Sequence, residues 1–337
     1  MVFLPLGQIV GWIAWAFLEY TIAVVQWTAS LPQGSTTEAR FDAPLLVVYY
    51  LVLLGATRLD WRGLLSRAAL RPAIALGVVL VAGMWVWSIA LTAPDGKTHV
   101  EFIDAGSAAT LVRTPSGRRI LIDGGANPSA VNSAVGEGMP FWERSLDLVV
   151  LTDTDDAHLA GLIDVLDRYD VRQIIQPSAP AKPTAAYLKW RDLVAQKNVP
   201  SLPAQAGLIV SLDRDVTLEI LFPNDLDSAR PAIAQLRAGN IAFLFADSAD
   251  TDDQSEWLSS PDAASSAVLI APRQISPEFV DAVSPQFAIL FAGSGAREKP
   301  TADVLSALAS ATILRTDERG DIEIVVDAQT LAVRPAK

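Results

Sequence analysis

The chain has 337 residues, of which 51% are hydrophobic, and its lack of cysteine excludes disulfides and thiolate metal sites. Its formal net charge of −12 argues against holding nucleic acid by a general electrostatic field, because phosphate binding rests on Lys and Arg. The charge is distributed unevenly: four of the 38 acidic side chains lie in residues 1–94, and 34 lie in residues 95–337. This break in composition predicts a domain boundary near residue 95.

Three apolar stretches precede that boundary. Leu4–Leu31 is long but carries Glu19 in its middle, so we expect either a membrane helix with Glu19 facing other helices or water, or an amphipathic helix lying at the interface. Pro44–Thr57 is apolar but short. Pro72–Ala93 has 22 residues without a charge. As a helix it would be roughly 33 Å long, enough for a hydrocarbon layer of about 30 Å, although a buried core helix is the alternative.

The arginines between the second and third stretches predict an orientation. Arg58, Arg62, Arg67 and Arg71 crowd into this loop, and positively charged loops stay on the cytoplasmic side. The sequence therefore predicts a membrane region at 1–94, with two to three transmembrane helices in contact with lipid. It predicts an extracytoplasmic domain at 95–337, and so a multi-pass protein of the cell membrane.

Strand-like and helix-like segments alternate after residue 97. The helix-like segment 158–170 places Leu159, Leu162 and Leu166 on one face. Early hairpins, βα units in the middle and a late return to strands predict two sheets with helices packed outside them. We expect strands at 99–106, 109–115, 118–125, 146–153, 171–177, 216–223, 240–247, 265–272, 287–293, 311–316 and 321–327, and helices at 158–170, 184–198, 276–283 and 302–310.

The order of these segments resembles the metallo-β-lactamase-like domain at the C-terminus of ComEC-family DNA-uptake channels. The resemblance runs from HVEFIDAG at residue 99 through LDLVVLTDTDDAHLAG to DIEIVVD, and the apolar stretches resemble the family's last membrane segments. It implies a four-layer αββα sandwich after α-helical transmembrane segments. It also implies a role in competence, with a channel for single-stranded DNA and a metal-dependent nuclease outside the membrane. The chain looks like the C-terminal portion of such a protein, without the earlier channel helices.

The resemblance also implies a set of site residues. The family's metal motif, roughly His-Pro-Asp-Ala-Asp-His, falls on residues 153–158, where Asp153 replaces the first His and Asp155 and His158 match. The family's Asp at a later strand end is kept as Asp247. Two further histidine stretches of the family fall on 271–274 and 299–301, which contain no His. Asp156 lies one place from a motif position, and Asp123 precedes a Gly pair in a loop near the site; both are expected to orient neighbours or to support the turn.

The residues themselves argue against a pair of zinc ions. Such a site relies mainly on imidazole, and the chain has two histidines in all, His99 and His158. We expect His99 to be a surface residue. The domain is therefore predicted to be a catalytically inactive pseudoenzyme, without a cofactor.

Three interpretations of the acidic loop remain open. Asp153, Asp155 and Asp156 precede a helix, where carboxylates cap and complement the helix dipole. Alternatively, Asp153, Asp155, His158 and Asp247 bind a hard cation, Mg²⁺ or Mn²⁺. The third interpretation is a relic with no role.

The function that follows from these patterns is a ComEC-like membrane protein related to DNA uptake, whose outer domain is a scaffold or handles DNA. One alternative is an active metal-dependent phosphodiesterase that uses the carboxylate-rich site. Another is a membrane-tethered interaction domain. The expected partners are membrane lipid, single-stranded DNA and a separate channel subunit.

Overall fold

A computed structural model of the chain describes residues 77–79, 81–83, 94–137, 139, 143–225, 229–260, 265–293, 299–327 and 330–335. Contacts divide the chain into two units, Met1–Val79 and Leu80–Lys337. The second unit contains every strand described below.

The expected membrane helices are not found in the described residues. No helix in this part of the chain combines the length and the apolar character that crossing a membrane requires. Leu4–Leu31 and Pro44–Thr57 lie outside the described residues, and of Pro72–Ala93 only 77–79 and 81–83 are described as helix. An apolar run has the hydropathy of a span, but a span also needs about 20 residues in one helix. The transmembrane part of the predicted fold is therefore wrong, and so is the predicted multi-pass location with an extracytoplasmic domain.

The second unit is built on two large sheets. The larger one has eight strands, in the order β17 (Thr330–Pro335), β16 (Ile322–Asp327), β1 (Thr98–Phe102), β2 (Thr110–Arg113), β3 (Arg119–Ile122), β5 (Leu148–Val150), β7 (Ile174–Gln176) and β8 (Ser201–Pro203). The other has seven, in the order β15 (Thr312–Arg315), β14 (Phe287–Leu290), β13 (Val268–Ile270), β12 (Ile241–Phe245), β11 (Ile233–Ala238), β10 (Val216–Phe222) and β9 (Ile209–Asp213). β4 (Ser145–Leu146) and β6 (Asp170–Val171) form a small separate pair.

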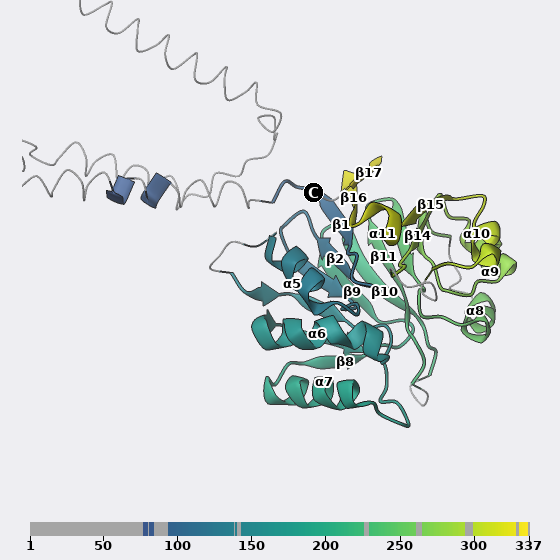
Figure 1. Cartoon of the computed structure of the whole chain (residues 1–337), viewed down its shortest axis with the longest axis horizontal. Coiled ribbons are helices and arrows are strands. Elements are labelled where there is room, and N and C mark those ends of the chain that lie inside the picture. The colour runs from purple at the N-terminus through teal and green to yellow at the C-terminus, as the bar shows by residue number, and fades with distance from the viewer. Residues whose placement is uncertain are drawn as a thin grey trace, which may run out of the picture. The chain divides into compact units, whose positions relative to one another are not determined.

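Helices cover the outer face of each sheet, as Figure 1 shows. α5 (Pro128–Glu137), α6 (Asp156–Arg168) and α7 (Ala185–Gln196) share a buried apolar cluster with the eight-stranded sheet. α8 (Thr251–Leu258), α9 (Pro277–Val283) and α10 (Ala302–Ala307) share another with the seven-stranded sheet. α11 (Thr316–Arg319) is a single turn after β15.

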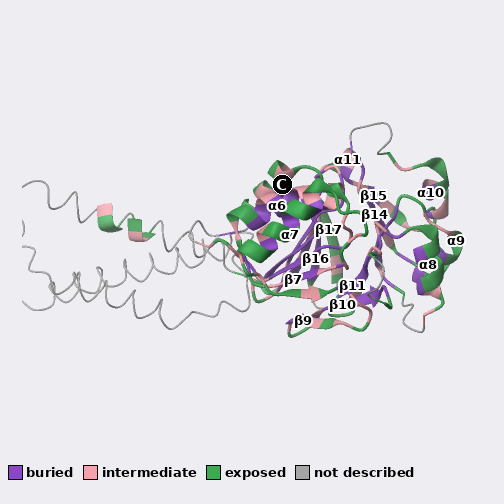
Figure 2. Ribbon diagram, turned by 90° about the horizontal axis from the view of Figure 1, so that it is seen from below, coloured by how far each residue is buried: buried purple, intermediate pink, exposed green. Residues whose placement is uncertain are grey.

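A third apolar cluster lies between the two sheets, where Figure 2 shows buried strands from both. The alternation of side chains along each strand explains why three clusters form. In β3, Ile120 and Ile122 belong to the cluster between the sheets, whereas Leu121 faces the helices. The layers are therefore helix, sheet, sheet and helix, and the predicted αββα sandwich is confirmed.

Each sheet contains a run of parallel strands. β3, β5, β7 and β8 are parallel neighbours in one sheet, and β12, β13, β14 and β15 in the other. Loops that follow parallel strands gather at the carboxyl edge of a sheet, which is where open α/β sheets place their ligands. The candidate site is built from such loops.

Candidate functional site

Asp123 is the first site residue in the chain and directly follows β3. Its backbone has a φ of 57°, an uncommon value for a residue other than glycine, and its side chain is 1% exposed. Both carboxylate oxygens accept hydrogen bonds from Thr152, which follows β5: the backbone N–H lies 2.8 Å from Oδ1 and the hydroxyl 2.6 Å from Oδ2. The two strand ends therefore hold this carboxylate in one orientation.

Two glycines bring helix α6 against the loop after β3. A Cβ added to Gly161 would lie 1.8 Å from the carbonyl oxygen of Gly124, and one added to Gly124 would lie 2.2 Å from the backbone nitrogen of Leu162. The contact is closed by hydrogen bonds from Gly124 N–H to the His158 carbonyl, 2.9 Å, and from Gly161 N–H to the Gly125 carbonyl, 3.2 Å. Only residues without a side chain permit this approach, which places His158 beside Asp123.

The third group comes from the other sheet. Asp247 follows β12, and its Oδ2 lies 3.2 Å from Nε2 of His158. Ligand atoms of Asp123, His158 and Asp247 all lie within 4.8 Å of one another, in a group that could hold a metal ion. We call these three residues the Asp-His-Asp cluster.

Ser248 completes the surroundings of the imidazole, but not as a nucleophile. Its hydroxyl lies 3.2 Å from Nε2 of His158 and 3.3 Å from Oδ2 of Asp247. A catalytic serine triad needs the serine on one ring nitrogen and the carboxylate on the other. Here both groups meet Nε2, whereas Nδ1 is buried and has no hydrogen-bond partner among the described residues. This arrangement does not support acyl transfer by Ser248.

Burial and crowding of charge perturb the cluster. Burial raises the pKa of Asp123 to about 7; the imidazole of His158 opposes this and the carboxylate of Asp247 adds to it. For His158 burial favours the neutral ring, but the hydrogen bond to Asp247 and the nearby carboxylates outweigh it and raise the pKa to about 9. The cluster thus concentrates negative charge around one imidazole, and a bound cation would relieve the repulsion between the carboxylates.

The other predicted site residues lie around this cluster rather than in it. Asp153 is half-buried, and burial raises the pKa of its carboxyl against the opposing effect of His158. Asp155 is exposed and is the N-cap of α6, although its side chain makes no capping hydrogen bond. Asp156 is exposed in the first turn, and its Oδ1 accepts a 2.6 Å hydrogen bond from the hydroxyl of Thr184. The structure thus brings together Asp123, His158 and Asp247, and leaves Asp155 and Asp156 apart.

Sequence reasoning gave Asp123 only a supporting place and missed Thr152 and Ser248. The available signal for Asp123 was a carboxylate at the end of a buried strand, directly before two glycines. Its closeness to His158 depends on the packing of α6, which no local pattern displays. Thr152 and Ser248 carry no sequence signal beyond their places next to strand ends.

The second histidine cannot join the cluster. His99 lies on β1 and is 17% exposed, with Nδ1 2.8 Å from Glu323 and Nε2 3.0 Å from Asp95. The described residues therefore offer one imidazole at the site, and a histidine-rich pair of metal ions does not fit this donor set. One hard cation, with two carboxylates and one imidazole as ligands, does fit.

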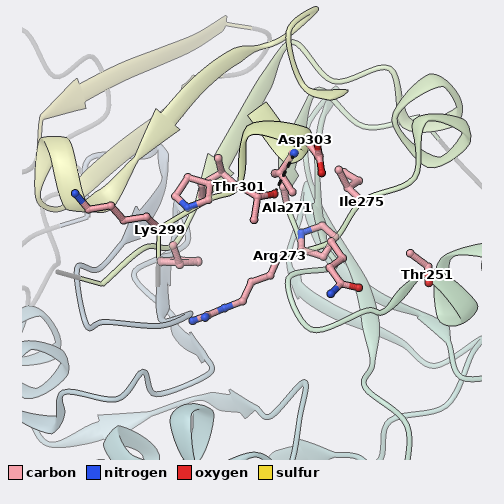
Figure 3. A pocket seen from close by; sticks show the side chains of 13 residues that line it. Thr251, Ala271, Arg273, Ile275, Lys299, Thr301 and Asp303 are labelled. Carbon is pink, nitrogen blue, oxygen red and sulfur yellow. Dashed lines mark hydrogen bonds between the residues drawn. The ribbon is translucent and has the colours of Figure 1, made fainter. Parts of the chain in front are cut away.

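A cavity of about 470 Å³ opens at the same carboxyl edge of the seven-stranded sheet. It is lined by residues that follow β13 and β14, among them Arg273 and Phe291, and by Lys299, Thr301 and Asp303 (Figure 3). These are the stretches 271–274 and 299–301, where the resemblance implies further histidines. Instead of histidine, these two stretches contain Arg273 and Lys299, which are both positively charged at neutral pH.

No protein-family model and no curated protein matches the sequence. Similar solved structures include CmlA, a diiron β-hydroxylase from Streptomyces venezuelae (TM-score 0.45, 14% identity, 71% of this chain and 54% of that one). A new diphosphatase of the PhnP family gives a TM-score of 0.43 at 13% identity, over 68% of this chain and 98% of that one. A mutant metallo-β-lactamase from Cronobacter sakazakii gives 0.37 at 16%, over 50% and 75%.

The neighbours are metallo-β-lactamase-fold proteins, and the chain spans about half the length of the hydroxylase. Likeness at this level bears on the fold alone, so the αββα assignment rests on the chain's own sheets and helices. The resemblance to ComEC stays a prediction.

Proposed function

We propose that this domain is a metal-dependent phosphodiesterase that uses one hard divalent cation, Mg²⁺ or Mn²⁺, held by Asp123, His158 and Asp247. The observation that carries the proposal is the convergence of these three groups within 4.8 Å, from the loop after β3, the first turn of α6 and the loop after β12. A cation bound there would polarise a phosphoryl oxygen and lower the pKa of a coordinated water.

The residues of the cluster are suited to this task because they are held before any ligand arrives. Thr152 fixes both oxygens of Asp123, yet each carboxylate oxygen has a second lone-pair site. Ser248 restrains Oδ2 of Asp247 and the imidazole of His158 together. Preorganised ligands of this kind lose little conformational freedom on binding.

The first experiment measures cation binding by the purified full chain. We expect Mn²⁺ to raise the thermal midpoint of unfolding. The variant Asp247→Asn should weaken Mn²⁺ binding at least tenfold, because asparagine has nearly the shape of aspartate but lacks its negative charge. Asp192→Asn is the matched control, since Asp192 is 71% exposed on α7 and its one ion pair among the described residues is with Arg191. The control should bind Mn²⁺ like the parent chain.

The second experiment measures hydrolysis of bis(p-nitrophenyl) phosphate with Mn²⁺. The parent chain and Asp192→Asn should release nitrophenol, and Asp247→Asn should lose most of this activity. Absence of both stabilisation and hydrolysis at millimolar Mn²⁺ would refute the proposal.

A second candidate function is supported by the same hydrogen bonds. Thr152 donates to both oxygens of Asp123, and Asp247 and Ser248 lie at Nε2 of His158, so these groups of the cluster already have protein partners without a cation. Such contacts also fit a catalytically inactive domain, for which the sequence resemblance to the ComEC family suggests handling of single-stranded DNA or contact with a channel subunit. Binding of labelled single-stranded DNA by the full chain, lost steeply with salt and without any Mn²⁺-dependent hydrolysis, would select this candidate.

A further inference from the structure

The cavity near the Asp-His-Asp cluster is lined by more positively than negatively charged side chains, in contrast to the chain as a whole. The chain as a whole is acidic, with a formal net charge of −12. Yet Arg273 and Lys299, both exposed side chains, line the same cavity of about 470 Å³. Neither makes a hydrogen bond or ion pair with any residue that the structure describes, so their charges are available to a ligand.

The acidic residue of the cavity does not neutralise these cations. Asp303 also lines it, but Figure 3 shows the side chains of Arg273 and Lys299 extending to one side of the cavity and Asp303 lying on the other. No ion pair joins Asp303 to either cation within the described residues. One side of the cavity is therefore an open cationic surface.

The loop after β13 holds Arg273 in place through its backbone. Gln254, which is fully buried in α8, donates from Nε2 to the carbonyl of Gln274, 2.8 Å, and accepts at Oε1 from the backbone N–H of Ser276, 3.0 Å. These hydrogen bonds hold the backbone that directly follows Arg273, which lowers the entropic cost of ordering the loop when an anion binds.

The cavity lies within reach of the cluster. Asp247 and Arg273 follow β12 and β13, which are adjacent parallel strands and so end at the same edge. Thr251 lines the cavity only four residues after Asp247, and four residues span at most about 14 Å even when fully extended.

We propose that Arg273 and Lys299 bind a phosphate group of the substrate other than the one that is cleaved. The inference rests on the proposed phosphodiesterase function and names its substrate class: phosphodiesters that carry a second phosphate. Guanidinium and ammonium groups are the side chains that bind phosphate in proteins, and a planar guanidinium can donate two parallel hydrogen bonds to it.

The first test uses inorganic phosphate as the probe and the full chain in EDTA, so that no cation contributes. Phosphate should raise the thermal midpoint of the parent chain. The double variant Arg273→Gln/Lys299→Gln should bind phosphate at least tenfold more weakly, because it removes two charge-assisted contacts. The control Lys182→Gln/Lys189→Gln makes the same change of charge at two exposed lysines and should match the parent. Absence of stabilisation, or equal stabilisation in the double variant, would overturn the proposal whatever the metal experiments give.

The second test uses two substrates with Mn²⁺: the p-nitrophenyl ester of thymidine 5′-phosphate, with and without a 3′-phosphate. We expect the parent chain to prefer the doubly phosphorylated substrate about tenfold in kcat/KM. The double variant should lose this preference and keep its rate on the simpler substrate. Phosphate binding without any preference would overturn the substrate assignment, whereas absence of hydrolysis would count against the proposed function and leave the first test to decide the cavity.

Discussion

The substitution Gly161→Ala tests whether the close approach of α6 to β3 builds the candidate site. The added methyl group would lie 1.8 Å from the Gly124 carbonyl oxygen, far inside any contact that real Cβ atoms make. Backbone atoms cannot rotate away as a side chain can. Helix α6 must therefore move from the loop after β3 by on the order of 1.5 Å to restore an ordinary contact.

The expected cost follows from the contacts that this movement breaks. Two backbone hydrogen bonds join Gly124 to His158 and Gly161 to Gly125, at 2.9 and 3.2 Å, and each contributes about 1 kcal/mol net. Overpacking adds roughly 1–3 kcal/mol, while alanine in a helix returns up to about 1 kcal/mol. The free energy of unfolding should fall by about 2–4 kcal/mol, or roughly 5–15 °C in the thermal midpoint.

Urea unfolding and thermal melts of the full chain measure this effect, with and without Mn²⁺. Gly136→Ala is the matched control: Gly136 is also helical, in α5, but its added Cβ would meet only the hydroxyl of Tyr169 at 3.6 Å. The control should be neutral or slightly stabilising. Gly161→Ala should also lose the stabilisation by Mn²⁺, because His158 moves away from Asp123. Equal stability of the two alanine variants would refute the reasoning about the close approach.

Two further substitutions probe the half-buried carboxyl of Glu101 and the buried carboxyl of Asp123. Burial raises the pKa of Glu101 to about 7 although Arg113 opposes this, so its ionisation costs native stability as the pH rises from about 4.5 to 7. Glu101→Gln should therefore stabilise the chain at pH 8, by at most about 3 kcal/mol, and should have little effect at pH 4; an equal effect at both would contradict the assignment. Thr152→Val removes the 2.6 Å hydrogen bond to Asp123 and should cost about 1–3 kcal/mol in urea unfolding, whereas Thr152→Ser, which keeps the hydroxyl, should cost much less.

The elements with a strong apolar pattern could be predicted from the sequence. In α6, Leu159, Leu162 and Leu166 recur at helical spacing, and all three are buried against the eight-stranded sheet. The missed elements lack such a pattern. Helix α5 buries only Val131, Ala134 and Val135, with small and polar residues between them, so its amphipathic character is weak. β11 is buried at nearly every position and includes Gln235, so it shows no alternation.

The site could be predicted only in part because it depends on contacts between distant segments. His158 and Asp247 follow from the resemblance, but 89 residues separate them, and their 3.2 Å contact exists only once the two sheets have packed. The same packing leaves Asp155 exposed and brings in Asp123, which local sequence shows merely as the end of a strand. The prediction of membrane helices rested on hydropathy, and no helix among the described residues is long and apolar enough to cross a membrane.

The three groups of the Asp-His-Asp cluster come from both halves of the sandwich, and this decides which measurement detects cation binding most directly. Asp123 and His158 belong to the half of the sandwich built on the eight-stranded sheet, and Asp247 belongs to the other half. The two halves are also joined by a hydrogen bond close to the carboxylate of Asp123, in which the Ala232 N–H donates to the Thr152 carbonyl at 2.7 Å. A cation bound by the cluster would link the two sheets, so its binding free energy would add directly to the stability of their packing. A stability measurement therefore detects the cation without any knowledge of the substrate. A hydrolysis assay detects it only when the chosen substrate is one that the protein cleaves.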